Sequence, residues 1–365
     1  MPLSHRQKVV LSTLIVLLVV VLMLTLAEGT VRVRQWMKYG HFSHLDDIYA
    51  VDQETGLRVP RSGASTGTIH INSLGFRGPP VSQLKTAGQL RLAFLGASTT
   101  FCAEVSSDEL TWPHLVSETI NNNASGVTVD YVNGAVPGYT VQSSLMNLRE
   151  RITPLEPDVI IIYHATNDLS RETRSLAEKQ GIYRAGTADE MSWLAEHSLL
   201  WFLVEKNLRL RSLREKTADM EHRLEFSPSQ LGSQFEADLK ELVTEAKKVS
   251  SMVALVTFSH RIRAGQTPEQ QLEAAGSALY YMPFMSPPAL IDSFARYNEI
   301  ITEVARETGV LLIDGEELIP GDGEHFNDTV HFKDAGSRAM ARRVSEALLR
   351  LPALQELLAA KRSNS

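Results

Sequence analysis

Short apolar runs alternate with helical patterns from about residue 90 to the end of the chain. Five runs have the length and apolarity of strands that are buried in a sheet. They are residues 91–96, 127–132, 158–163, 252–258 and 310–314. Between and after these runs, apolar residues recur every three or four positions, as on one face of a helix. This alternation predicts an α/β fold in which a parallel sheet of about five strands has helices on both faces.

A different pattern precedes the sheet. Residues 9–27 form an uncharged apolar run, VVLSTLIVLLVVVLMLTLA, which as a helix is roughly 28 Å long and matches the roughly 30 Å core of a bilayer. This run predicts an uncleaved transmembrane signal anchor after a short tail at residues 1–8, and a cleaved signal peptide is the alternative. Basic residues lie on both sides of the run, so the positive-inside count does not favour export. We still expect the main domain outside the cytoplasm, as is typical of a signal anchor with a short N-terminal tail.

Three further segments fall outside the alternation. Residues 28–88 are rich in Gly, Ser, Thr and Pro and predict a membrane-proximal segment, in which glycines flank Phe76 and Arg77. We interpret this pair as a structural cap on the next domain, with substrate binding as the alternative. Residues 169–231, inside a domain of residues 89–352, predict a helical insertion. We interpret it as a helix that packs on the domain, and a lid over the site or a surface that rests on the bilayer are the alternatives. Residues 353–365 are expected to be a C-terminal tail.

Composition narrows the classes of partner and site. The chain has 365 residues and a formal charge of −7, so it lacks the excess of Lys and Arg with which proteins neutralise nucleic-acid phosphates. The single cysteine, Cys102, excludes an internal disulfide and a metal site built from several cysteines. We therefore expect no nucleic-acid partner.

Residues that can perform acyl transfer follow the predicted strands. Ser98 follows the first strand, Gly138 the second and Asn167 the third, and Asp328 and His331 lie in the loop after the fifth. The carboxyl ends of parallel strands gather at one edge of a sheet, where ligands bind. We therefore interpret Ser98 as nucleophile, His331 as general base and Asp328 as the group that orients the imidazole. The N–H groups of Ser98 and Gly138 and the Asn167 side chain would form the oxyanion hole.

Each of these residues also has a structural interpretation on its own. Ser98 can cap a helix, Gly138 can serve a turn, and Asn167 can form an Asx-turn. His325 is a rival base, and it can also join Asp328 and His331 in a metal site that would leave the serine unexplained. The order of the groups, each after its own strand, favours the catalytic interpretation.

The same motifs resemble those of a known family. The stretch from Leu90 to Leu351 is similar to SGNH hydrolases of the GDSL esterase/lipase superfamily. Its ordered blocks are Gly96-Ala97-Ser98, Asn133 to Thr140, Ala165-Thr166-Asn167-Asp168 and Asp328-Thr329-Val330-His331. The resemblance implies a flavodoxin-like three-layer fold and ester hydrolysis without a cofactor or metal ion. It also implies that the second oxyanion donor is Gly138 and not Gly134.

Two positions depart from the pattern of the family. Ala97 replaces the Asp of the first block, which is not a member of the triad, and Ala165 replaces the Gly of the third block, where a methyl group is expected to crowd the backbone near Asn167. The sequence thus predicts a membrane-anchored serine esterase that acts on O-acyl esters, with acetyl groups on cell-envelope or extracellular carbohydrate as the first choice. A lipid esterase, an O-acyltransferase and a catalytically silent binding domain are the alternatives.

Overall fold

Five parallel strands form the centre of the computed structural model, which describes residues 4–39, 48–182, 192–218 and 223–363. They are β5 (Gln89–Gly96), β6 (Thr128–Asn133), β7 (Val159–Tyr163), β8 (Met252–Val256) and β9 (Leu311–Ile313). Their order across the sheet is β6-β5-β7-β8-β9, which is the flavodoxin-like order. All eight residues of β5 and all five of β7 are buried, as continuous apolar runs in a covered parallel sheet require. The predicted strands and the parallel sheet are confirmed.

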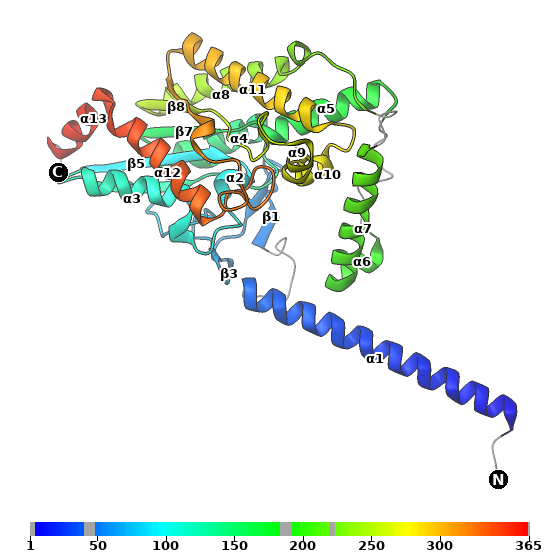
Figure 1. The fold of residues 1–365 in the computed structure, drawn as a ribbon. Helices are drawn as coiled ribbons and strands as arrows, with labels where there is room; N and C mark the ends of the chain where they lie inside the picture. Colours follow the sequence, from blue (N-terminus) through cyan, green and yellow to red (C-terminus); the bar gives the residue numbers. More distant parts are fainter. Residues whose placement is uncertain (1–3, 40–47, 183–191, 219–222, 364–365) are drawn as a thin grey trace.

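Helices cover both faces of this sheet (Figure 1). One face carries α3 (Trp112–Asn123) and α12 (Asp334–Leu349), which pack against each other. The other face carries α4 (Val141–Asn147), α5 (Thr166–Lys179), α8 (Ser233–Val249) and α11 (Pro287–Thr308). The longest of these, α11, begins at a Ser286 cap followed by proline and ends at Gly309 in the left-handed conformation, as capping preferences dictate. The predicted three-layer α/β/α fold is confirmed.

The segment before the sheet packs onto the loops at the carboxyl ends of the first two strands. It contains two small hairpins, β1 (Tyr49–Val51) with β2 (Arg58–Pro60) and β3 (Ser65–Thr66) with β4 (Ile69–His70). Their apolar side chains form a second core with residues of the later loops. Its members are Ile48, Tyr49, Leu57, Ile69, Ile71, Ala97, Phe101, Ala135, Val136 and Tyr139. Residues 48–78 are therefore built into the main domain.

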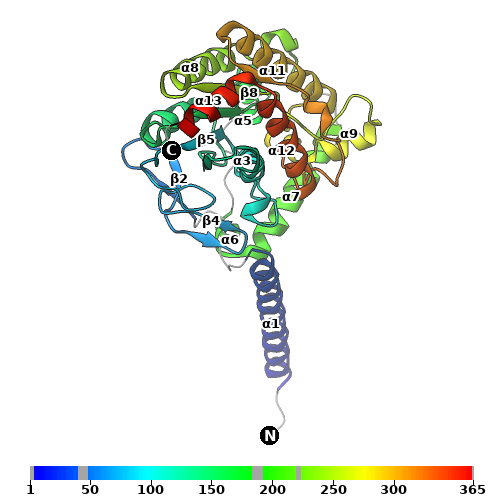
Figure 2. The ribbon, with the colours of Figure 1, turned by 90° about the vertical axis from the view of Figure 1, so that its left-hand side faces the viewer.

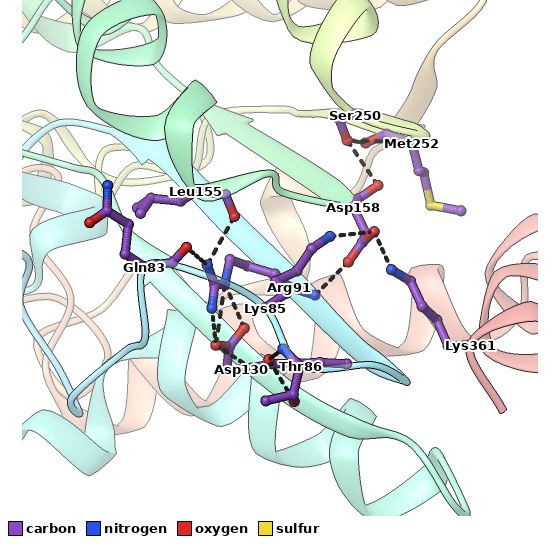
Figure 3. A network of polar contacts seen from close by, with 11 residues as sticks. Gln83, Lys85, Thr86, Arg91, Asp130, Leu155, Asp158, Ser250, Met252 and Lys361 are labelled. Carbon is purple, nitrogen blue, oxygen red and sulfur yellow. Dashed lines mark hydrogen bonds and ion pairs between the residues drawn. The ribbon is translucent and has the colours of Figure 1, made fainter. Parts of the chain in front are cut away.

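The opposite edge of the sheet is closed by a network of charges (Figure 3). Arg91 of β5 is fully buried and pairs with Asp130 of β6 at 2.7 Å, and Asp158 accepts hydrogen bonds from Lys85 and Lys361. Lys361 belongs to α13 (Pro352–Ser363), which lies where the sequence predicted a C-terminal tail. Two buried leucines of α13 explain the difference, because they pack the helix onto the domain.

A long helix and a helical pair extend from the main domain. The first helix, α1 (His5–Tyr39), continues beyond the predicted span on both sides, and its apolar surface is not buried in the described structure (Figure 2). By length and composition it meets the requirements of a membrane anchor or a signal sequence. The insertion is narrower than predicted, because α5 is part of the helical layer. Among the described residues, the α-helices that remain in it are α6 (Trp193–His197) and α7 (Leu199–Ala218), and α7 packs against α10 (Gly276–Tyr281).

Candidate active site

A sharp turn after β5 presents Ser98 at the carboxyl edge of the sheet. β5 ends at Gly96, and Ser98 begins the four-residue helix α2 (Ser98–Phe101). A Cβ atom at Gly96 would lie 2.2 Å from Oγ1 of Thr100, so only glycine allows the strand to approach the turn this closely. The turn ends at Cys102, which has a positive φ of 60°. For a residue with a side chain this conformation is unfavourable and must be held by its surroundings.

Arg77 supplies that support from the N-terminal segment. Its side chain is fully buried and donates hydrogen bonds to the backbone oxygens of Phe101 and Cys102, at 2.8 and 2.6 Å. Its Nε also pairs with Asp108 at 2.6 Å. The predicted structural cap around Phe76 and Arg77 is thus confirmed, and it acts directly on the helix that carries Ser98.

Ser98, His331 and Asp328 form a continuous chain of hydrogen bonds. Nε2 of His331 lies 2.8 Å from Oγ of Ser98, and Nδ1 lies 2.8 Å from Oδ2 of Asp328. Asp328 also accepts hydrogen bonds from the backbone N–H groups of Val330 and His331, which fix the carboxylate within its loop. Serine and histidine are 233 residues apart in the chain. This geometry allows the imidazole to take the Ser98 proton while the carboxylate stabilises the resulting cation.

Two further hydrogen-bond donors face the same space. Gly138 lies in the loop after β6 with a φ of +90°, and no atom lies within 4 Å of the position a Cβ would take. The amide nitrogen of Asn167, at the start of α5, donates to the backbone oxygen of Tyr139 at 2.9 Å, which orients the side chain. Asp168 accepts a hydrogen bond from the Val141 N–H and so ties this loop to α5. An amide nitrogen has a second hydrogen, which leaves Asn167 able to donate to a ligand.

These groups line one cavity of about 340 Å³. Arg58 of β2, Ser170 of α5 and Tyr281 of α10 complete its wall. The volume lies at the lower end of the range for small-molecule sites. The cavity is therefore built by the strand-end loops together with the N-terminal segment and α10.

A second carboxylate acts on the imidazole. Burial lowers the pKa of His331, but the carboxylates of Glu104 and Asp328 outweigh burial and raise that pKa to about 9. Burial also raises the pKa of Asp328, yet the His331 ring and backbone N–H groups bring it down to about 2. Burial raises the pKa of Glu104, and among the described residues no group donates a hydrogen bond to its Oε2 atom. Glu104 thus interacts with the triad through its charge.

Two histidines that follow strands, His164 and His260, lie outside the cavity. His164 is buried against Ser144, and burial lowers its pKa to about 3; His260 stacks on Phe294, and burial with the nearby Arg263 has the same effect. Neither lines the cavity, although both follow strands.

The rival base His325 forms a pair of its own. Its Nδ1 lies 2.8 Å from Asp322, three residues earlier, so the Asp-x-x-His spacing occurs twice in this loop. Only His331, of the two, contacts Ser98. Spacing alone does not distinguish these pairs.

The structure also describes the surroundings of Ala165, of Cys102 and of the residues that could bind a metal ion. Ala165 is buried, and the hydrogen bond from Asn167 to Tyr139 forms in its presence, so the methyl group does not displace the amide. Cys102 is buried, which raises its pKa to about 12 and suits a packing residue. Within the described ranges, no group of three or more His, Cys, Asp or Glu side chains is arranged to hold a metal ion.

Sequence reasoning missed Glu104 and Arg58 at this site. Glu104 lies six residues after Ser98 in a stretch without regular periodicity, and Arg58 lies in the segment that was interpreted as membrane-proximal. No spacing rule connects either residue to a strand end. An acidic residue among the buried neighbours Phe101, Cys102 and Val105 was the one available signal for Glu104.

Comparison with known proteins identifies the family. Residues 94–339 match the model of the GDSL-like Lipase/Acylhydrolase family, which is more than half of the chain. The chain belongs to this family. As a GDSL-like acylhydrolase it is a serine hydrolase that acts on ester bonds, and the resemblance noted from its motifs is confirmed.

Several solved structures resemble the chain at low sequence identity. A variant of an acetyl xylan esterase from Geobacillus stearothermophilus is 16% identical, with a TM-score of 0.45 over 73% of this chain and 96% of that one. An alpha/beta hydrolase enzyme from the metagenome of Lake Arreo, Spain, is also 16% identical, with a TM-score of 0.43 over 72% of this chain and 96% of that one. No curated protein matches the chain.

Proposed function

We propose that this GDSL-like hydrolase cleaves O-acyl esters with Ser98 as nucleophile, His331 as general base and Asp328 as the residue that orients the imidazole. The observation that carries the proposal is the pair of 2.8 Å contacts, from Ser98 to His331 and from His331 to Asp328, at the wall of the cavity. Both lie within the distance range expected for a nucleophile and its base.

The reaction proceeds in two halves. Oγ of Ser98 attacks the ester carbonyl as Nε2 of His331 accepts its proton. The N–H groups of Ser98 and Gly138 and the amide of Asn167 donate to the oxyanion that develops. The imidazolium then gives its proton to the departing alcohol, which leaves an acyl group on Ser98. Water, deprotonated by the same imidazole, releases the acid and restores the serine.

The volume and lining of the cavity favour a substrate with a small acyl group on a polar alcohol. Its volume of about 340 Å³ suits an acetyl group with part of a sugar, and the Ser170 hydroxyl in its wall can exchange hydrogen bonds with a sugar hydroxyl. Acetyl groups on cell-envelope or extracellular carbohydrate are therefore the proposed substrates. No cofactor or metal ion takes part in the proposed steps.

The length and apolarity of the first helix support the proposal that the chain is anchored in a membrane. We expect α1 to cross the bilayer once and the hydrolase domain to lie on the extracytoplasmic side. Carbonate extraction of membranes tests the anchor, because a transmembrane protein stays in the pellet. Reporter fusions after Ser365 test the side, and a cytoplasmic signal would contradict it.

Covalent labelling tests the catalytic proposal directly. A fluorophosphonate should label the full chain and the Ser170→Ala variant but not Ser98→Ala. Ser170 is a matched control because it lines the same cavity without contacting the imidazole. The parent and Ser170→Ala should also hydrolyse p-nitrophenyl acetate, whereas Ser98→Ala should not. Labelling of Ser98→Ala at the parent rate would rule out Ser98 as the nucleophile.

A further inference from the structure

The helical pair α6–α7 meets α1 at one point. In Figure 1 the pair stands at the side of the domain, and its lower end approaches the long first helix. Figure 2 shows α6 beside the end of α1 that faces the domain. Contacts between α1 and α7 therefore connect the proposed anchor to the insertion.

A carboxylate of α1 caps the first turn of α7. Glu28 accepts hydrogen bonds from the backbone N–H groups of Leu199 and Leu200, at 3.1 and 2.9 Å, and from the Ser198 hydroxyl at 2.8 Å. These N–H groups have no partner within their own helix, so an acid is favourable here. Arg32 pairs with Glu28 at 2.6 Å and keeps the carboxylate in place.

This cap fixes the position of the start of α7 along the axis of α1, next to the end of its apolar part. Glu28 directly follows the uncharged run of residues 9–27. If that run fills the hydrocarbon core, Glu28 lies at the boundary between lipid and water. The start of α7 is held at the same boundary by its hydrogen bonds to Glu28.

Large apolar side chains are exposed at this level. Trp193 is 67% exposed, Leu194 48% and Trp201 42%, whereas Ala195 and Leu199 between them are buried. The indole N–H of Trp201 is already satisfied by the Ser192 hydroxyl at 3.1 Å, so its exposed ring needs only an apolar neighbour. Tryptophan is enriched where proteins meet the membrane–water interface.

We propose that the α6–α7 pair rests on the lipid surface where α1 leaves the bilayer, with Trp193, Leu194 and Trp201 inserted among the headgroups. The inference rests on the proposed anchoring of α1, and it is independent of the proposed chemistry. The occupant of this surface is the bilayer itself, because the Glu28 cap joins the surface to the end of the membrane-spanning run. Since α7 also packs on α10, which lines the cavity, this contact fixes how the cavity faces the membrane.

Site-specific fluorescence in vesicles tests the proposal with the full chain. Cys102 is buried, so a nitrobenzoxadiazole label on an introduced cysteine reports one position. The label is placed at Leu194→Cys, at Leu18→Cys within α1, and at Lys248→Cys, where the side chain is 61% exposed. Lys248 belongs to α8, a helix that lies far from α1 (Figure 1). Vesicles of phosphatidylethanolamine and phosphatidylglycerol are prepared with and without brominated acyl chains.

Brominated lipid should lower emission at positions 18 and 194 by about twofold or more, with little change at 248. Quenching at 18 without quenching at 194 would overturn the proposal and leave the anchor intact. Absence of quenching at both positions would overturn the anchor, and the lipid contact with it. A label at 194 that is unaffected by bromine but changes with protein density would show that a second copy covers this surface instead. Hydrolysis of p-nitrophenyl acetate by the same vesicles reports on the catalytic proposal separately.

Discussion

Replacing Glu104 by glutamine should shift the pH dependence of the reaction. His331 can accept the Ser98 proton only while its ring is neutral, so activity falls as pH drops through the pKa of the ring. In the free enzyme this pKa is raised from 6.5 to about 9, against burial, by Glu104 and Asp328. Glu104→Gln keeps the shape of the side chain and removes its charge.

The expected size of the shift follows from the electrostatic contacts of His331. Among the groups that raise its pKa, the charge of Glu104 has the largest single effect. We therefore expect the pH at which kcat/KM falls on the acid side to decrease by about one unit, which corresponds to about 1.4 kcal/mol. At pH 7, well below the pKa of about 9, this raises the fraction of neutral imidazole about tenfold. The variant should thus gain activity at neutral pH by roughly that factor.

The assay is a pH profile of kcat/KM on p-nitrophenyl acetate from pH 5 to 10. Glu109→Gln is the matched control, because Glu109 is exposed and does not act on His331. Its profile should coincide with that of the parent. If a folded Glu104→Gln variant loses kcat/KM at the same pH as the parent, or at a higher pH, the proposed effect of Glu104 on His331 is refuted.

Three further changes probe the serine turn and the donors around it. Ser98→Ala and His331→Ala should each remove most of the activity, and the double variant should be little worse; single losses that multiply would contradict a common mechanism. Asn167→Ala should lower kcat by roughly 100-fold with a smaller effect on KM, and an unchanged kcat would remove the amide from the oxyanion hole. Arg77→Met should lower the free energy of unfolding in urea by about 3–5 kcal/mol, because it removes the donor that the buried carbonyls and Oδ1 of Asp108 share. Arg77→Lys should show a smaller loss, and an unfolding midpoint of Arg77→Met equal to that of the parent would refute the supporting role.

The sequence predicts the sheet and the residues at its strand ends because both follow local rules. Buried parallel strands are continuous apolar runs, and β7 is an example in which every residue is buried. Ser98 and Asn167 follow such runs closely, and His331 lies in the loop between the last strand and the last helix of the sheet layer, so the topology brings all three to one edge. The family block at Asp328 to His331 favoured His331 over His325, whereas the Asp-x-x-His spacing alone did not, because it occurs at both positions.

The remaining features depend on contacts between distant segments. The hydrogen bonds of Arg77 to the Cys102 turn cross 25 residues, and those of Glu28 to α7 cross more than 170. Neither set of hydrogen bonds produces a periodic pattern of residues in the sequence. The C-terminal helix was missed because its two core leucines, Leu354 and Leu358, resemble any short amphipathic stretch.

The separation of Ser98 from His331 has a consequence for synthesis. The two residues are 233 positions apart, so at about 5–20 residues per second the ribosome needs roughly 10–50 s to pass from one to the other. During this interval the nascent chain already carries its apolar first helix, but its serine has no base. If α1 is the anchor proposed above, chains that terminate before residue 331 would reach the membrane without the proposed general base. With the proposed triad, the order of residues along the chain keeps the enzyme inactive until translation is nearly complete.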